Sequence, residues 1–295
     1  MRMGRTVATE RRTFVGFLLV APAVIFLVAF FVVPNFQMVV YSISARSEAG
    51  VMIESWNVGN YLRLFDVDLY RIVLIRTLRV SFLTTIISII IGYPLAIVMV
   101  RGSDAWARVI TVVVLAPLLV NVVVRAYGWT LILSKKGLLN WMLTWLGLAE
   151  DPGQILYTEW AVVIASVHVF IAFMVLPLAG AISKIDAAVD EAARVLGASE
   201  WTLFRRITVP LSLPGLAVGT TLVFSMTAAS FVTPQILGGN FSALLGSLIE
   251  QQVMAVHDWS FAAAIATVLI VIVLFINLVY LTLVQRYFGA WAPVE

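Results

Sequence analysis

Charged and aromatic side chains able to bind a partner gather in one short stretch, residues 190–215, of an otherwise apolar chain. Carboxylates stand at its start, and Arg205 and Arg206 follow the aromatic residues Trp201 and Phe204. Aromatic rings and arginine are enriched at buried protein–protein contacts. The stretch is therefore as consistent with an ordinary amphipathic loop on a membrane surface as with docking of a partner protein.

Side chains for enzymatic chemistry are scarce. The sequence holds no cysteine and only two histidines, His168 and His257, which lie in different segments. This excludes disulfides and thiolate metal sites, and it leaves little material for a histidine-based metal centre or an acid–base pair. A phosphate-binding loop of the form Gly-x-x-x-x-Gly-Lys-Ser/Thr is also missing from the sequence. An integral-membrane enzyme is thus poorly supported.

Composition places the chain in a membrane. Of its 295 residues, 62% are hydrophobic and 12% are charged, and the mean hydropathy is +1.02. A soluble domain carries about a quarter charged residues, so the excess apolar surface needs lipid. The isoelectric point near 9.3 fits lysines and arginines in cytoplasmic loops, and we expect no nucleic-acid partner.

Six uncharged apolar runs are each read as a membrane span. About 20 apolar residues cross a hydrocarbon core as a helix, and these runs lack the alternation of barrel strands. The third run is short, and it can continue to Leu133 if Arg125 reaches the interface or faces protein. The sequence predicts an all-α integral membrane protein with six transmembrane helices. The runs are Phe14–Val33, Val80–Val100, Val109–Val124, Trp160–Ile182, Leu211–Leu237 and Phe261–Val284.

Basic residues orient these spans. The first run is longer than a signal-peptide core and lacks a small-residue cleavage site after it, so we expect a retained helix. Lysine and arginine are denser in the pieces that a cytoplasmic N-terminus would place inside, and Gly238–Ser260 has none. Both termini are therefore predicted to be cytoplasmic. The expected parts are a cytoplasmic tail at 1–13, a first transmembrane helix at 14–34, an extended periplasmic loop at 35–75, a transmembrane core at 76–286 with a polar loop at 186–210, and a cytoplasmic tail at 287–295.

The local sequence predicts a helix–turn–helix elbow at residues 186–210. Alanines favour a helix over Asp186–Leu196, and Gly197 interrupts it. Ser199 is a candidate N-cap for a second short helix, which Pro210 is expected to end. The residues expected to share one apolar side of the elbow are Val195, Leu196, Leu203 and Phe204.

The elbow resembles the signature loop of permeases from binding-protein-dependent ABC importers. That signature reads Glu-Ala-Ala, three residues, Gly, nine residues, Ile, one residue and Leu-Pro. The resemblance implies the type I importer permease fold and a multi-pass place in the bacterial inner (plasma) membrane. The matching positions are Glu191, Ala192, Ala193, Gly197, Ile207 and Pro210, with Val209 in place of leucine.

The resemblance also implies partners. Permeases of this family carry no ATP site, so ATP and Mg²⁺ would be used by a separate ATPase, and this chain is expected to bind no cofactor or metal and to be no enzyme. The implied complex holds two permease subunits, an ABC ATPase dimer on the cytoplasmic side and a periplasmic or extracellular solute-binding protein, all at the lipid bilayer. The residues expected to couple to the ATPase are Glu191, Ala192, Ala193, Gly197, Ala198, Ser199, Trp201, Phe204, Arg205, Ile207 and Pro210.

Further segments resemble the spermidine/putrescine permease subfamily. Arg125–Trp129, Phe231–Gly239 and Gly246–Gln252 carry this likeness, and Trp56–Tyr61 resembles the first of that system's two permeases. The likeness implies a polyamine solute and a second, different permease. Relatives of the same fold import iron(III), thiamine, opine-type or amino-acid-like compounds, so these solutes stay as alternatives.

Residues suited to a cationic solute are few. Ammonium groups favour carboxylates and aromatic faces, but no acidic residue lies inside the six runs. An interfacial aromatic belt and solvated loop charge account for the aromatic and acidic candidates better than a pathway role does, and hydrogen bonding between helices is at least as good an account of Asn121. A secondary transporter or channel subunit is the alternative from another class, although such carriers usually hold ionisable residues at depth. The pathway candidates are Asn121, Tyr127, Trp129, Phe231, Gln235 and Glu250.

Overall fold

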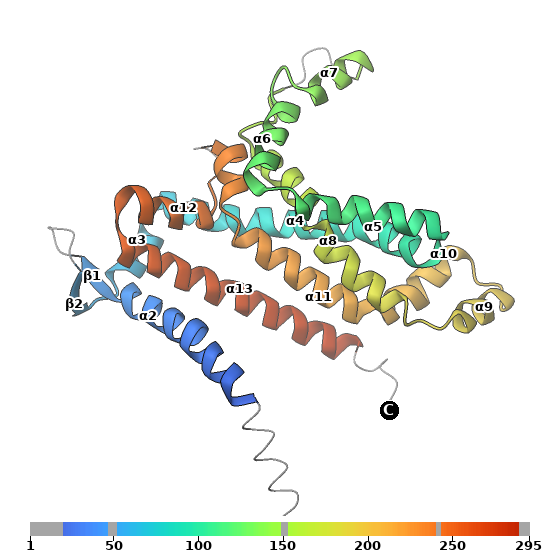
Figure 1. Cartoon of the computed structure of the whole chain (residues 1–295), viewed down its shortest axis with the longest axis horizontal. Helices are drawn as coiled ribbons and strands as arrows, with labels where there is room; N and C mark the ends of the chain where they lie inside the picture. Colours follow the sequence, from blue (N-terminus) through green and yellow to red (C-terminus); the bar gives the residue numbers. More distant parts are fainter. Residues whose placement is uncertain (1–19, 47–51, 149–152, 240–242, 289–295) are drawn as a thin grey trace, which may run out of the picture.

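The structure is a computed structural model that describes residues 20–46, 52–148, 153–239 and 243–288. Four long helices run side by side (Figure 1): α4 (Asp68–Arg101), α8 (Glu159–Ile182), α11 (Val209–Ala228) and α13 (Trp259–Phe288). The predicted tail 1–13 and the segment from residue 289 onward lie outside the described residues. The predominantly helical architecture inferred from hydropathy is confirmed.

Some of the shorter elements lie at the two ends of this bundle, whereas α5 runs alongside the long helices (Figure 1). One end, called here the hairpin end, carries a two-stranded antiparallel sheet with α3 and α12, and the opposite end, the elbow end, carries α9 and α10 (Figure 1). The shorter elements are η1 (Val28–Val32), α2 (Val33–Ser42), β1 (Ser44–Arg46), β2 (Met52–Trp56), α3 (Gly59–Asp66), α5 (Asp104–Leu119), α6 (Val122–Leu133), α7 (Leu138–Trp145), α9 (Ala187–Val195), α10 (Glu200–Leu203), η2 (Phe204–Thr208), η3 (Pro234–Gly238), α12 (Leu245–Gln251) and η5 (Gln252–Val256).

Five helices among the described residues are long and apolar enough to cross a membrane. A sixth span exists only if α5 and the α6–α7 segment are taken together, and these are bent by 107°. The bend falls at Val120, where the backbone is extended, and Asn121 caps the next helix by accepting from the Val123 N–H at 2.9 Å. The third predicted run is therefore a broken span rather than one helix.

Arg125 stabilises this break. Its guanidinium donates to the carbonyl oxygens of Pro117 and Val120, the second at 3.1 Å. Carbonyls at a helix C-terminus have no intrahelical partner, and lipid offers none. Of the two options for Arg125, the structure thus supports the one in which the side chain faces protein.

Two helices continue through prolines that the sequence assigned to boundaries. The first helix runs from Val20 to Ser42, past Pro34, and the helix from Glu200 to Ala228 runs past Pro210. A π-helical turn precedes each proline, so that Val33 bonds to Val28 and Val209 bonds to Phe204. These wider turns shift the bonding pattern where the proline ring would clash with a carbonyl.

The segment predicted as an extended loop at 35–75 is mostly ordered structure. It holds the end of α2, the β1–β2 hairpin, α3 and the first residues of α4. Asn60 donates to the carbonyl oxygens of Ser42 and Ser44 at 3.0 and 3.1 Å, which ties α3 to the end of α2. Arg63 of α3 pairs with Asp258 at 3.0 Å, just before α13. The fifth predicted run, Leu211–Leu237, is helical over a shorter length than expected, because α11 ends at Ala228.

The centre of the bundle is a close crossing of α4, α8 and α11. A Cβ atom built on Gly92 would lie 2.8 Å from Met174 Cγ, and one on Gly219 would lie 2.9 Å from Met174 Sδ. One on Gly215 would lie 2.4 Å from the carbonyl oxygen of Pro177. The Gly215 and Gly219 pair therefore permits the near contact of backbones expected from its small-xxx-small spacing.

Gly215→Ala tests this crossing. The added methyl group has to push α8 away, so we expect a loss of about 1–3 kcal/mol in stability, as for other overpacked sites. Gly180→Ala in α8 is the matched control, because a Cβ there meets nothing within 4 Å. Thermal unfolding of the detergent-solubilised protein measures both, and equal melting temperatures for the two variants would contradict the close crossing.

Candidate functional site

The elbow lies at one end of the bundle, between the end of α8 and the start of α11 (Figure 1). Its first helix, α9, begins after Asp186, whose carboxylate accepts from the Ala188 N–H at 2.9 Å. The helix ends one residue earlier than expected from the alanine pattern. Caps at both ends therefore define the elbow.

Gly197 closes α9 in the left-handed conformation, with φ of +83°. The N–H of Gly197 donates to Arg194 O at 2.9 Å, and that of Ala198 donates to Ala193 O at 3.0 Å. This pair of bonds is the Schellman motif, which favours glycine because it lacks a Cβ atom. The predicted interruption at Gly197 is confirmed.

Ser199 caps the second helix, α10, as predicted. Its Oγ accepts from the Thr202 N–H at 3.3 Å. Arg194 and Glu200 form an ion pair across the turn, with Nε to Oε1 at 3.0 Å. The hydrogen bond to Glu200 and its opposite charge raise the pKa of Arg194. Both side chains are well exposed, so solvent screens the pair and the caps do more to fix the turn.

The elbow has two apolar faces instead of the single one that was predicted. Val195, Leu196 and Trp201 are 88%, 87% and 67% exposed. Leu203 is 2% exposed, and Phe204 is half-buried. The prediction was wrong because the Gly197 turn separates two helix axes, so helical spacing does not carry across it. One face packs on the bundle and the other points to solvent.

Aromatic contacts anchor the buried face. The Phe204 ring meets Tyr93 of α4 edge-on, with centroids 5.5 Å apart, and Trp201 lies 5.5 Å from Phe204. The Tyr93 hydroxyl lies 3.0 Å from Ser212 Oγ of α11. The elbow is thus connected to two of the central helices. The other residues expected to couple to the ATPase are exposed (Glu191, Ala192, Gly197, Ser199 and Arg205) or half-buried (Ala193, Ala198, Ile207 and Pro210).

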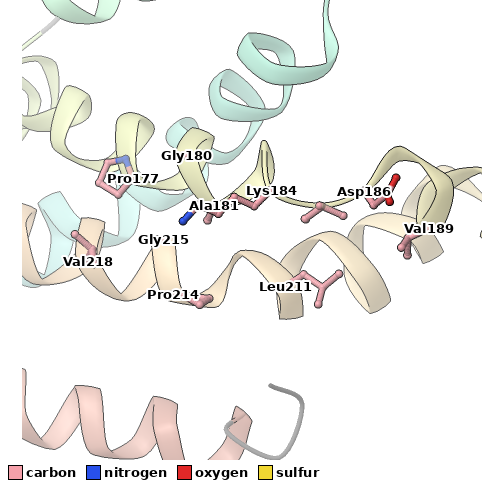
Figure 2. A pocket seen from close by; sticks show the side chains of 11 residues that line it. Pro177, Gly180, Ala181, Lys184, Asp186, Val189, Leu211, Pro214, Gly215 and Val218 are labelled. Carbon is pink, nitrogen blue, oxygen red and sulfur yellow. The ribbon is translucent and has the colours of Figure 1, made fainter. Parts of the chain in front are cut away.

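A hollow of about 600 Å³ lies beside the elbow, between α8, α9 and α11. Figure 2 shows its lining side chains, which are mostly small or apolar. Lys184 and Asp186 bring charge to its rim. On this side, therefore, α9 is not tightly packed against the bundle.

Arg101, the last residue of α4, makes a contact that sequence reasoning missed. Its guanidinium pairs with Asp190 of α9 at 2.7 Å and donates to Thr208 Oγ1 of η2 at 3.2 Å. From the sequence, Arg101 was only one of the basic residues in the segments predicted to be cytoplasmic. Asp190 directly precedes the signature glutamate, which was the one available signal that this carboxylate has a role.

The pathway candidates fall into four groups. Asn121 is a helix cap, as described above. Trp129 donates to His168 Nδ1 at 3.3 Å, which ties α6 to α8. Gln235 Nε2 donates to Glu250 Oε2 at 3.2 Å, and both belong to the hairpin end. Tyr127 and Phe231 remain 59% and 46% exposed.

Two other polar features of the described residues bear on the alternatives. Asn277 donates to Ser225 Oγ at 2.9 Å, so this intramembrane amide joins α13 to α11. The residues that the structure describes contain no group of three or more histidine, aspartate or glutamate side chains able to hold a metal ion.

Solved structures share the whole architecture. The bacterial alginate ABC transporter, in complex with an alginate pentasaccharide-bound periplasmic protein, aligns with a TM-score of 0.74 at 19% identity. The match covers 95% of this chain and 97% of that one. This likeness concerns the fold, which is that of a type I ABC-importer permease.

Sequence relatives identify the family. Residues 3–289 match the model of the binding-protein-dependent transport system inner membrane component. The chain is 34% identical over 254 residues to the spermidine/putrescine transport system permease protein PotB of Escherichia coli K12, covering 86% of this chain and 92% of that one. It is 31% identical over 242 residues to the inner membrane ABC transporter permease protein YdcU of the same organism, covering 77% and 75%.

The chain therefore belongs to the family of inner membrane components of binding-protein-dependent transport systems. It is a permease subunit of an ABC importer and a multi-pass protein of the inner membrane.

Ser199→Ala tests the cap of the elbow. Removing Oγ leaves the Thr202 N–H without its acceptor, and such a loss costs about 1 kcal/mol, or about fivefold in local opening. Ser103→Ala is the matched control, since Ser103 stands at the N-cap of α5 but makes no side-chain cap bond. Hydrogen exchange of the Thr202 amide should rise about fivefold only in the first variant. Unchanged exchange in Ser199→Ala would show that the cap is not needed.

Proposed function

We propose that this chain forms half of a translocation pathway and receives movement from a separate ATPase through the elbow. The outward face of the elbow supports this proposal. Val195, Leu196 and Trp201 expose apolar surface next to Gly197, at the tip of a capped and anchored structure. Apolar and aromatic side chains of this kind act as anchors in a partner's cleft.

The proposed complex contains two ATPase subunits, which use ATP and Mg²⁺, and a solute-binding protein on the other side of the membrane. Both termini and the elbow of this chain face the cytoplasm. ATPase closure moves the elbow, and the elbow moves α4 and α11 as rigid bodies, which exposes the pathway to alternate sides. ATP hydrolysis belongs to the ATPase, and this chain binds neither nucleotide nor metal.

A second, different permease completes the pathway. The α6–α7 segment projects away from the other helices (Figure 1), and it carries exposed Leu131, Trp141 and Trp145. Exposed apolar surface of this extent is covered by lipid or by another subunit. A partner permease packed on this segment would enclose the pathway between the two chains.

A polyamine is the proposed solute. The support is the identity to a spermidine/putrescine permease over most of both chains. Glu250 also supports it, because a half-buried carboxylate held by Gln235 offers the negative charge that an ammonium group needs. Phe231 and Tyr127 expose aromatic rings to which such a cation can bind.

Gly197→Trp tests the coupling role. The substituent places a bulky ring at the elbow tip, where a Cβ meets nothing within 4 Å of this chain, so the ring should block a partner. The left-handed backbone at Gly197 adds strain to any side chain, so the control has to share this conformation. Gly147→Trp is the matched control for backbone strain, because Gly147 has a similar φ of +68° and equally open surroundings at the end of α7, and it should leave co-purification of the ATPase unchanged. We expect Gly197→Trp to abolish co-purification of the ATPase and ATP-driven uptake, with membrane insertion intact. Wild-type uptake in this variant would contradict the proposed coupling role of the elbow.

Glu250→Gln tests the polyamine pathway. Removing the charge should reduce uptake of labelled spermidine or putrescine about tenfold, the loss expected from one charge-assisted contact. Asp66→Asn, an exposed carboxylate of α3 at the same end, is the control and should leave uptake unchanged.

Calorimetry on the cognate binding protein decides the solute. Binding of a polyamine supports the proposal. Binding of iron(III), thiamine or an amino-acid-like compound instead, with no response to polyamines, rules out the polyamine and keeps the permease.

A further inference from the structure

Three separate segments meet at the guanidinium of Arg101. Arg101 itself ends α4, Asp190 lies in the middle of α9, and Thr208 lies at the end of η2. The contacts are 2.7 Å to Asp190 and 3.2 Å to Thr208. One side chain therefore joins the first half of the elbow, its second half and a central helix.

The Asp190 carboxylate depends on this contact. Its side chain is only 11% exposed, and Oδ1 is buried without a hydrogen-bond partner. The other oxygen, Oδ2, takes the Arg101 charge. The Arg101 side chain is 26% exposed, so the pair is only partly buried, but removing Arg101 leaves the buried Asp190 charge without its partner, which costs more than losing an exposed pair. The pair thus holds α9 against α4 more firmly than the exposed Arg194–Glu200 pair holds the turn.

The side of α9 about 100° round the axis from Asp190 lacks comparable packing. Val189, the residue before Asp190, lines the hollow between α8, α9 and α11 (Figure 2). The contact with Arg101 is therefore the firm attachment of α9, while the hollow leaves space on the other side.

Helix α4 can carry a displacement over a long distance. It has 34 residues and so spans about 50 Å at 1.5 Å per residue. It packs closely on α8 at Gly92, and Arg76, near its other end, pairs with Glu159 at 3.1 Å. A push applied at Arg101 therefore acts on one continuous helix, with Pro94 inside it, that reaches the hairpin end.

We propose that Arg101 is a positioning residue that transmits movement of the elbow to α4 by holding Asp190 and Thr208 together. The proposal rests on the coupling role given above to the elbow. It adds a second connection between the elbow and α4. The first is the contact of Phe204 with Tyr93, and the second is the contact of Asp190 with Arg101, the last residue of α4.

Transport by the reconstituted complex tests the transmission. We expect Arg101→Met and Asp190→Asn to retain the ATPase subunit but to lose about tenfold in solute uptake per ATP hydrolysed, because the ATPase then moves an elbow that is loosely held. The charge-swapped double variant, Arg101→Asp with Asp190→Arg, should recover most of this loss, as pairwise coupling requires. Arg108→Met, an exposed arginine of α5, is the control.

A distance measurement tests the attachment without relying on transport. The chain has no cysteine, so spin labels can be placed at Ala188→Cys in α9 and Ser103→Cys at the start of α5, both exposed. In the full complex the distribution of label-to-label distances should be narrow with and without ATP. Asp190→Asn should broaden this distribution.

The two readouts separate the possible failures. Equal distance distributions in the wild type and in Asp190→Asn, or normal uptake per ATP in both single variants, would overturn the proposed role of Arg101. If the unmodified complex shows no ATP-driven uptake, the coupling function fails instead, and the label distances still decide whether Arg101 holds the elbow to α4.

Discussion

Backbone hydrogen bonding in lipid is the constraint on which the rest of this structure depends. A polar backbone group in the hydrocarbon region must find a partner within the protein. The chain meets this demand even where its helices are interrupted. Arg125 supplies donors to the open carbonyls at the end of α5, and π-helical turns carry two helices through Pro34 and Pro210.

The sequence predicted the features that depend on local pattern. Apolar runs located the long helices, and the caps at Gly197 and Ser199 lie where their residue types placed them. Features that depend on contacts between distant residues were missed. The pairing of β1 with β2 is one, and the Arg101–Asp190 contact is another, because neither leaves a periodic signal in the chain. Two residues, Pro117 and Asn121, gave local signals for the break at Val120. They were overlooked because the residues around them are apolar and uncharged.

Proline was the least reliable guide to the site. Proline has no N–H and its ring clashes with the carbonyl four residues earlier, so it often ends or kinks a helix. In this chain a π-helical turn before Pro210 avoids that clash, so the second helix of the elbow, α10, and α11 form one continuous helix from Glu200. The consequence for function is direct, since α10 is rigidly joined to α11, whereas α9 is joined to the bundle through side chains.

The π-helical turn at η2 also sets the direction in which the elbow faces. A π turn holds one residue more than an α turn, and one residue corresponds to about 100° of rotation about a helix axis. The side chains before Phe204 are therefore turned by that amount relative to a plain helical extension of α11. Deletion of a single residue within η2 would turn the elbow around the α11 axis and would break the contacts that Leu203 and Phe204 make with the bundle. The length of this one turn therefore decides which side chains of the elbow face the bundle and which face solvent.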